Sequence, residues 1–342
     1  MSRGYPIPRI AIVGASSLRG RELKQFIEDE NFAVADIALI DTNLPVGTLS
    51  EAAGEPTFLK PMDRESFDGA RLVFFCGSAH EAASNWKLAA DAGATIIDLT
   101  GALEDVGAAP WIPDLDTLLA PPEPKTGQPH HPGIYSSPAP PVMIACRLAA
   151  ALSEFSPSRV VILFFPPASE HEQLGIDELE KQTADLLLLR PISQVVFDAQ
   201  VAFSLLASYG DASRPAISEM RGEICKRVAS YLCGRSPLPA VQLIQAPIFY
   251  GYAFAAYADL PPSVELPAID AALFAAGMHV VGKGDPKPTN VSVAGEAKIH
   301  IAHAEHDAGV TSGVWLWGAA DNLRIAAVNA MRIAEELLAP KV

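Results

Sequence analysis

Hydrophobic runs and helical periodicities alternate along the N-terminal part of the chain. Short β-branched runs bounded by turn residues are typical of buried parallel strands, and apolar residues three or four positions apart are typical of helices. Strands that alternate with helices in this way predict a doubly wound, Rossmann-type parallel sheet in an α/β fold. The expected strands are residues 9–13, 35–40, 71–75 and 94–97, and the expected helices are residues 21–28 and 81–92.

The pattern changes after a proline-rich stretch at residues 121–133. Beyond it, longer strands follow one another closely, which favours an α+β domain with a mixed or antiparallel sheet. We expect a first domain at residues 1–132, joined by a C-terminal helix at 320–342, and a second domain at 133–319. The helices predicted beyond the proline-rich stretch are 142–152, 175–189, 221–232 and 321–338, and the strands are 159–165, 241–248, 252–257 and 297–304.

Composition narrows the class of protein. The 342 residues include 25 Lys and Arg against 40 Asp and Glu, a net charge of −15, which argues against a nucleic-acid-binding face. Residues 1–8 lack the apolar core of a signal peptide, and no apolar run is long enough to cross a membrane, so we expect a cytoplasmic protein. The four cysteines form no C-x-x-C pair, which predicts reduced and mostly buried thiols: Cys76, Cys146, Cys225 and Cys233.

A glycine turn joins the first strand to the first helix. Such a turn can hold a pyrophosphate on the amides of the helix N-terminus. Gly14 fits the tight turn, Gly20 allows close packing of the helix, Ser16 or Ser17 can cap it, and Arg19 can reach a phosphate. The spacing departs from G-x-G-x-x-G, so an ordinary capped turn without a ligand is an equally good interpretation.

Asp41 ends the second predicted strand. An acidic residue there accepts hydrogen bonds from an adenosine ribose and repels a 2′-phosphate, so a bound dinucleotide is expected to be NAD rather than NADP. The alternative is a simple turn residue, because Asp41-Thr42-Asn43 is also good turn chemistry.

Several stretches of this sequence match one family over nearly its whole length. Residues 14–20 match G-A-T-G-x-V-G, residues 92–98 resemble A-G-A-x-V-I-D, and residues 175–183 resemble G-x-x-E-L-x-x-Q-T. Three segments, residues 321–324, 329–330 and 333–335, resemble the D-N-L-R, N-A and I-A-E of D-N-L-R-x-G-A-A-x-N-A-x-x-I-A-E. The chain thus resembles the aspartate-semialdehyde dehydrogenases of amino-acid biosynthesis. The resemblance implies a homodimer whose second domain carries the dimer contact and substrate-like site. It also implies this cofactor-binding set: Gly14, Ser16, Ser17, Leu18, Arg19, Gly20, Asp41, Cys76, Gly77, Ser78 and Asn322.

The family's catalytic centre does not carry over. In that family a cysteine thiolate attacks the substrate carbonyl, the adduct gives hydride to the nicotinamide, and phosphate releases the acyl group. The nucleophile lies in N-P-N-C-S-T, which matches residues 137–142 here, and Pro140 takes the place of the cysteine. Proline carries no nucleophile. Cys146, six residues further on, is interpreted as a core thiol.

Other catalytic positions of the family are also replaced. Its active-site glutamine aligns with Pro166, its substrate-binding arginine with Gln245 and its histidine with Tyr252. Two cationic, anion-binding positions align with Glu104 and Glu219, where a carboxylate would repel phosphate or a substrate carboxylate. These replacements predict a pseudoenzyme with no catalytic residue for that reaction.

Two other functions stay open. One is an NAD(P)-dependent oxidoreductase with different catalytic residues, such as the retained Glu223 or His171. The other is a true aspartate-semialdehyde dehydrogenase in a different alignment register. The sequence indicates no protein partner beyond a second copy of the chain.

No metal site is predicted. The triplet at 170–172 can be an acid–base pair or half a metal site, but a solvated loop is the favoured interpretation. A strand at 297–304 would send His300 and His303 to opposite faces, which disfavours one shared ion with His306.

Overall fold

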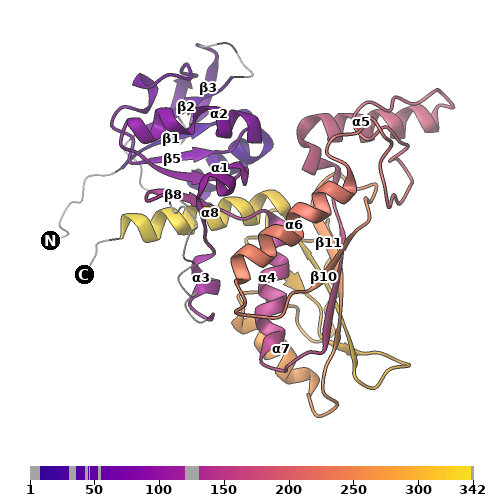
Figure 1. Ribbon diagram of the computed structural model, residues 1–342. Helices are drawn as coiled ribbons and strands as arrows, with labels where there is room; N and C mark the ends of the chain where they lie inside the picture. Colours follow the sequence, from indigo (N-terminus) through magenta and orange to yellow (C-terminus); the bar gives the residue numbers. More distant parts are fainter. Residues whose placement is uncertain are drawn as a thin grey trace. The chain divides into compact units, whose positions relative to one another are not determined.

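The computed structural model describes residues 8–30, 36–42, 45, 47–52, 55–119 and 131–339. The chain forms two compact units (Figure 1). Unit 1 comprises Met1–Pro113, Pro124–Ala139 and Ala326–Val342, and unit 2 comprises Asp114–Glu123 and Pro140–Ile325. The last helix crosses the boundary between them, and the domain limits expected from the sequence stay a prediction.

Unit 1 is built on a six-stranded sheet with the order β2-β1-β5-β6-β8-β7, in which the strand pairs are parallel. A separate hairpin is formed by β3 and β4. The strands are β1 (Arg9–Val13), β2 (Asp36–Ile40), β3 (Leu49–Ala52), β4 (Glu55–Phe58), β5 (Leu72–Phe75), β6 (Thr95–Asp98), β7 (Ala109–Pro110) and β8 (Ile134–Ser136). The helices are α1 (Leu18–Asp29), η1 (Glu65–Phe67), α2 (Ala79–Asp91), η2 (Ala102–Val106), α3 (Pro113–Asp116), which runs into unit 2, and α8 (Asn322–Leu338).

The sheet of unit 1 is buried on both faces. Ile10 and Ile12 of β1 belong to a cluster that includes Leu23 of α1 and Ala330 of α8. The intervening residues of β1 belong to a second cluster with Trp86 of α2. The two-residue alternation of a strand therefore sends successive side chains into two cores, which explains the continuous apolar run in the sequence.

Unit 2 is built on a seven-stranded mixed sheet with the order β10-β9-β11-β15-β13-β12, and β14 pairs with β15. The β9–β10 pair is parallel, whereas β11 is antiparallel to both β9 and β15. The strands are β9 (Arg159–Phe165), β10 (Ala240–Leu243), β11 (Tyr252–Asp259), β12 (His279–Val280), β13 (His300–Ile301), β14 (Glu305–His306) and β15 (Gly313–Ala320). The helices are α4 (Pro140–Ser153), η3 (Ala168–His171), α5 (Glu172–Leu187), α6 (Ile217–Leu232) and α7 (Leu266–Ala275).

The two faces of the unit 2 sheet differ. Helix α4 packs on α6, α7 and β9, and α6 packs on β10, so these helices cover one face (Figure 1). Along β11, Phe254 and Ala256 are buried, whereas Ala255 and Tyr257 on the opposite face are half-buried. On the neighbouring β15, Trp315 of that second face is 44% exposed. We call Ala255, Tyr257, Trp315 and Trp317 the exposed sheet face.

The predicted fold class is confirmed in both units, and the strand at 9–13 and the strand at 159–165 have the predicted bounds. Helix α1 begins earlier than predicted because Ser17 caps it. The strand predicted at 241–248 ends at Leu243, because the Gln245 backbone pairs with Leu206 instead. Only two residues of the strand predicted at 297–304 are in a strand, β13, so the alternation argument for His300 and His303 was wrong.

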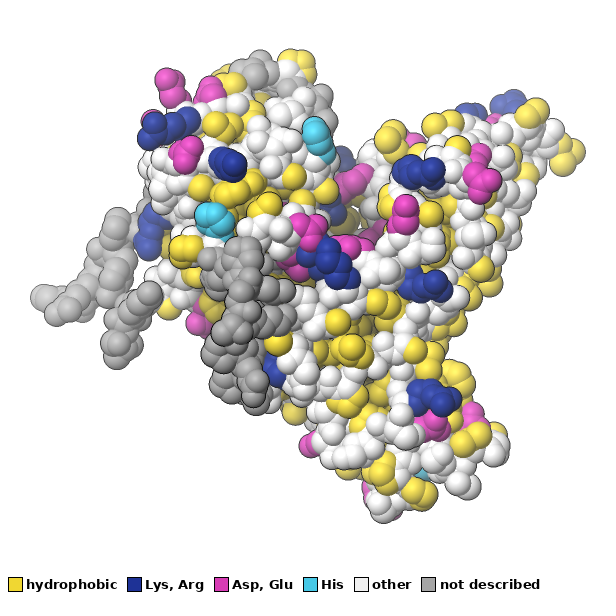
Figure 2. Space-filling view, in the orientation of Figure 1, with side chains coloured by type: hydrophobic (Ala, Val, Ile, Leu, Met, Phe, Trp, Pro, Cys, Tyr) yellow, Lys and Arg dark blue, Asp and Glu magenta, His cyan; other side chains and the backbone are white. Residues whose placement is uncertain are grey.

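The structure also bears on the expectations about cysteine burial, membrane-spanning helices and surface charge. Cys76 and Cys146 are buried as predicted, but Cys225 is exposed. The described helices include none that combines the length and apolar character needed to cross a membrane. Over the described residues of the face shown in Figure 2, lysine and arginine side chains are scattered and form no continuous stripe. Of the proline-rich stretch at 121–133, residues 121–130 lie outside the described residues.

Candidate functional site

The turn between β1 and α1 brings three backbone segments into close contact. Gly14 has a φ of +75°, and a Cβ on it would lie 2.3 Å from the Cα of Gly77. A Cβ on Gly20 would lie 2.2 Å from the carbonyl oxygen of Gly14. Only glycine avoids these overlaps, so the sequence spacing of the two glycines reflects the close approach of α1 to the ends of β1 and β5.

Ser17 fixes the start of α1. Its Oγ accepts the amide of Gly20 at 3.0 Å and donates to the carbonyl of Cys76 at 2.9 Å. The N-terminus of a capped helix beside a tight glycine turn suits the pyrophosphate of a dinucleotide, because helix amides and the helix dipole favour an anion there. When a dinucleotide is bound, residues 14–20 would hold its phosphates.

Arg19 lies along the end of β5. Its Nε donates to the carbonyl of Cys76 at 3.1 Å, and its guanidinium donates to the carbonyl of Gly77 at 2.8 Å. Arg19 therefore ties α1 to the strand end as well as offering a positive charge there. The structure thus brings together residues 14–20 and Cys76–Ser78, as the predicted cofactor-binding set requires.

Two carboxylates lie at the same place. Asp41 is 3% exposed, and its Oδ2 accepts the amide of Ser16 at 2.7 Å. Glu81 of α2 is 6% exposed and accepts the hydroxyl of Thr42 at 2.7 Å. Burial raises the pKa of Glu81, and the charge of Asp41 raises it further. We call residues 14–20, 41–42, 76–78 and Glu81 the glycine-turn site.

Sequence reasoning missed Glu81. The signal that was available is its spacing from Ser78, which caps α2 by accepting the Glu81 amide at 3.1 Å. Serine followed three residues later by glutamate is the pattern of a capping box. Here the glutamate side chain turns instead to Thr42, which lies 39 positions earlier in the chain.

The position that aligns with the catalytic cysteine begins a helix. Pro140 is the first residue of α4. Proline is favoured at this position because its fixed φ suits the first turn and its missing N–H would have no partner within the helix. Cys146 lies farther along α4 and is fully buried, as predicted for a core thiol.

Gln245, which aligns with the family's arginine, is 0% exposed and fully engaged. Its Nε2 donates to the carbonyls of Pro166 at 3.0 Å and Ala246 at 2.8 Å, so its Oε1 is the acceptor of the Tyr209 hydroxyl at 2.6 Å. The oxygen of Tyr209 lies 3.1 Å from Nε2 of His171. We call His171, Tyr209, Gln245 and Pro166 the Gln245 network.

The directions of these hydrogen bonds fix the state of His171. Because Tyr209 donates to Gln245, Nε2 of His171 carries the proton that Tyr209 accepts. Burial lowers the pKa of His171 to about 4, so the ring is neutral at pH 7. Phe197 packs against His171 and Tyr209 with ring centroids 4.8 and 5.3 Å away. The group is a closed polar chain within an aromatic cluster.

A second buried cluster surrounds Tyr252, the position of the family's histidine. Tyr252 is 0% exposed, and burial, together with the charge of Glu170, raises its pKa well above the usual range. Asn322 donates to Glu170 at 3.2 Å and to Ser169 at 3.1 Å, and it accepts the Gly251 amide at 3.0 Å. Asn322, predicted to bind cofactor, thus lies in unit 2 with its amide engaged by this cluster, and its role toward a cofactor stays a prediction.

Two side chains of the family motif at 175–183 form hydrogen bonds with the backbone of the segment that follows α5. Glu178 accepts the amides of Val195, at 3.0 Å, and Val196. Gln182 accepts the amides of Val201 at 2.8 Å and Ala202 at 3.2 Å. Both side chains are buried, so this stretch of the resemblance reflects how α5 anchors the segment that follows it.

The remaining acidic positions have local partners. Glu223 is half-exposed on α6 and pairs with Arg227 at 2.5 Å. Glu219 caps α6 by accepting the Ala216 amide at 2.8 Å. Glu104 accepts the hydroxyl of Ser136 at 3.0 Å. Each of these three carboxylates therefore has a structural hydrogen bond or ion pair with a nearby residue.

His300 and His303, which were weighed as metal ligands, have separate partners. Nδ1 of His303 lies 2.6 Å from Asp270, and His300 packs against His279 with ring centroids 4.5 Å apart. Within the described ranges, no group of three or more potential ligands is arranged to hold a metal ion.

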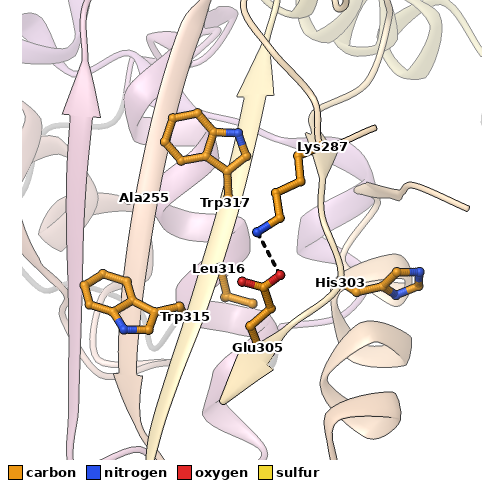
Figure 3. A pocket seen from close by; sticks show the side chains of 7 residues that line it. All are labelled: Ala255, Lys287, His303, Glu305, Trp315, Leu316 and Trp317. Carbon is orange, nitrogen blue, oxygen red and sulfur yellow. Dashed lines mark ion pairs between the residues drawn. The ribbon is translucent and has the colours of Figure 1, made fainter. Parts of the chain in front are cut away.

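A pocket lies on the exposed sheet face, and none of the predicted cofactor-binding residues lines it (Figure 3). Trp315 and Trp317 flank it, and Lys287 forms an ion pair with Glu305 at 2.7 Å across it. The Trp317 indole donates to the carbonyl of Pro288 at 2.7 Å. Since its polar atom is already satisfied, the Trp317 ring offers an apolar surface to a neighbour. The pocket is lined by Ala255, Lys287, His303, Glu305, Trp315, Leu316 and Trp317.

Solved structures share this fold. A Pseudomonas aeruginosa protein described as a probable aspartate-semialdehyde dehydrogenase is 28% identical and superposes with a TM-score of 0.83, covering 97% of this chain and 98% of the other. Aspartate semialdehyde dehydrogenase II of Vibrio cholerae has a TM-score of 0.83 at 20% identity, over 97% of this chain and 98% of the other, which shows the shared fold.

Curated relatives carry two different names. The USG-1 protein homolog of Pseudomonas aeruginosa is 28% identical over 96% of this chain and 97% of its own length. The aspartate-semialdehyde dehydrogenase of Rickettsia bellii is 24% identical over 96% and 97%. The family model of the semialdehyde dehydrogenase NAD binding domain matches residues 9–117, and that of the dimerisation domain matches residues 157–325. The chain therefore belongs to the semialdehyde dehydrogenase family.

Proposed function

We propose that this chain is a non-catalytic member of its family, a homodimeric scaffold that keeps an NAD-type nucleotide site and has lost the aspartate-semialdehyde dehydrogenase reaction. The observation that carries the proposal is the engagement of Gln245. The side chain at the position of the substrate-binding arginine is buried, neutral and hydrogen-bonded through both ends of its amide.

A substrate-binding residue needs an accessible polar group whose partner is the substrate. Gln245 instead forms hydrogen bonds with Tyr209, Pro166 and Ala246. Breaking these bonds would leave buried polar groups without partners, and each such group would lower the free energy of unfolding by about 1–3 kcal/mol. Tyr252 is likewise buried, and Pro140 starts a helix. The three positions now support packing, which suits a fold kept for reasons other than this chemistry.

The nucleotide half of the proposal concerns the glycine-turn site. Gly14, Gly20 and the Ser17 cap favour a pyrophosphate at the start of α1, and Asp41 favours a ribose without a 2′-phosphate. The proposed ligand is therefore NAD rather than NADP. When bound, it would supply the adenosine and phosphate groups that these residues recognise.

The dimer half concerns the exposed sheet face. Trp315 is 44% exposed there and packs edge-on against Tyr257, with ring centroids 5.0 Å apart. Exposed aromatic side chains on a flat sheet are typical of a surface that a partner covers. A second copy fits best, because the family's dimerisation domain spans this face and the Lys287–Glu305 pair offers both charge signs to a symmetric partner.

The test is the initial rate of NADH or NADPH formation by the purified protein with aspartate semialdehyde and phosphate. We expect a rate equal to that of the no-enzyme control with either dinucleotide. A relative with the N-P-N-C-S-T sequence, assayed in parallel, shows that the reagents work. Turnover by this chain above the control would refute the proposal.

One observation favours a second function, an oxidoreductase that uses other residues. His171 is neutral at neutral pH because burial lowers its pKa to about 4, so its ring has a free lone pair, although so low a pKa makes it a weak base. Its Nδ1 is the nitrogen available for this role, since Nε2 faces Tyr209. Screening 2-hydroxy acids, alcohols and semialdehydes with NAD, in the wild type and in His171→Gln, tests this alternative. Activity that the substitution removes would support it.

A further inference from the structure

Glu81 reaches from one strand end of the glycine-turn site to another. It stands in the first turn of α2, next to the end of β5, and its carboxyl packs against the backbone of Gly77. Its Oε1 accepts the hydroxyl of Thr42 at 2.7 Å. Thr42 directly follows Asp41 at the end of β2. The side chain therefore brings a second carboxylate to the place where Asp41 lies.

This place decides which dinucleotide a Rossmann-type domain accepts. The residues that follow the second strand contact the adenosine ribose, and a 2′-phosphate there needs a cationic partner. Arg19 is turned toward the carbonyls of Cys76 and Gly77. Lys24, whose ammonium contacts Ser50, faces the charges of one other cation, Arg21, and of three carboxylates: Glu28, Asp41 and Glu51. The balance of charge at the end of β2 is negative.

We infer that Glu81 is a specificity-determining residue of the glycine-turn site, where with Asp41 it selects a dinucleotide whose adenosine ribose carries no 2′-phosphate. The inference rests on the proposed function, because it takes the site to bind a dinucleotide. Glu81 and Asp41 are both little exposed, so water and salt screen their repulsion of a phosphate poorly. The hydrogen bond from the Thr42 hydroxyl holds the Glu81 carboxyl near the end of β2, where the adenosine ribose would bind.

The experiment is calorimetric titration of the full chain with NAD and with NADP, comparing the wild type with Glu81→Gln, Thr42→Val and Asp91→Asn. Glutamine keeps the size of Glu81 and an oxygen for Thr42 but removes the charge. Asp91 is exposed at the other end of the same helix, so its replacement removes one charge from α2 without touching the site. A thermal melt of each variant shows that it is folded.

We expect the wild type to bind NAD at least about 100-fold more tightly than NADP. Glu81→Gln lowers this ratio about tenfold, Thr42→Val lowers it a few-fold, and Asp91→Asn changes it less than about twofold. A ratio in Glu81→Gln equal to that in Asp91→Asn overturns the inference and leaves NAD binding intact. If neither dinucleotide binds any variant, the inference and the nucleotide half of the proposed function fall together, while the turnover assay still tests the loss of chemistry.

Discussion

The glycine-turn site and the Gln245 network differ in physical character. The first keeps glycines that only a close backbone approach explains, at Gly14 and Gly20. The second is centred on Gln245, whose buried amide is hydrogen-bonded at both ends to neighbouring protein groups. A binding turn is maintained by backbone geometry, whereas a catalytic centre depends on side chains that can be exchanged one by one for packing.

The side chains of the family motifs that this chain retains have structural roles. Glu178 and Gln182 anchor the loop after α5, and Asp321 caps α8 by accepting the amides of Leu323 and Arg324 at 3.0 Å each. Asn329 joins the carbonyl of Trp111 and the hydroxyl of Ser137, each at 2.9 Å. These positions hold the fold together, so the resemblance at these motifs reflects the fold rather than the reaction.

The largest effect is expected from Gln245→Arg, which restores the family's residue to a closed network. A guanidinium at this fully buried position cannot accept the Tyr209 hydroxyl and must be desolvated, so it should lower the free energy of unfolding by about 3–5 kcal/mol. Urea unfolding followed by circular dichroism measures the change. Gln173→Arg, the same exchange at an exposed position of α5, should cost less than about 0.5 kcal/mol. Equal stability of the two variants would show that the centre is still open to water.

The exposed sheet face should respond strongly to a charge. Trp315→Asp replaces an aromatic ring that is 44% exposed by a carboxylate, and we expect the dimer dissociation constant to rise at least about 100-fold. Light scattering after gel filtration over a range of concentrations measures it. The control is Phe274→Asp on α7, where the phenylalanine is 67% exposed. A Trp315→Asp protein that stays as dimeric as this control would place the dimer contact elsewhere.

The Gln245 network should make stability depend on pH. The pKa of His171 is about 4 in the folded chain, against an ordinary value of 6.5. As the pH falls through this window, the unfolded chain takes up the proton first, so stability present above pH 6.5 is lost toward pH 4. The contribution is about 2–3 kcal/mol. Unfolding curves at pH 7 and 4 for the wild type and His171→Gln isolate it. An identical pH dependence in both proteins would mean that His171 is already solvated.

The smallest of these effects concerns the glycine-turn site. Gly20→Ala forces a Cβ toward the Gly14 carbonyl oxygen, which is 2.2 Å away, and should cost about 2 kcal/mol and weaken NAD binding about tenfold. The matched control is Gly222→Ala in α6, where an added Cβ meets nothing within 4 Å and alanine favours the helix by about 1 kcal/mol. NAD affinity that is unchanged in Gly20→Ala would separate this turn from nucleotide binding.

The sequence predicted the elements whose signals are local. The strand at 159–165 is a continuous apolar run, and α8 shows a clear apolar face, so both were found. Strand β15 was missed because its sequence mixes small residues with two tryptophans and lacks a β-branched run. Strand β12 was missed because it has only two residues and is defined by its pairing with β13, and β13 is the part of the strand predicted at 297–304 that pairs with β15.

Some residues of the candidate sites could likewise be predicted from the sequence, and others could not. Gly14, Gly20 and Asp41 follow predicted strands, so their place in the fold could be expected from strand order. The partners of Gln245 could not, because Tyr209 lies 36 positions away from it in the chain. Tyr209 is brought there by tertiary packing, and no spacing rule connects the two. For the same reason the contact between Glu81 and Thr42 appeared only in the structure.

The most direct test of the central claim, that the chemical centre has been closed by several replacements and not switched off by one, is the turnover of Pro140→Cys. The assay measures NADH or NADPH formation from aspartate semialdehyde and phosphate, with a thermal melt to confirm folding. We predict that restoring the nucleophile alone gives a rate equal to that of the wild type and of the no-enzyme control, because Gln245 stays engaged by its neighbours and Tyr252 stays fully buried. A clear gain of turnover in Pro140→Cys would contradict the account and show a centre that still lacks only its cysteine.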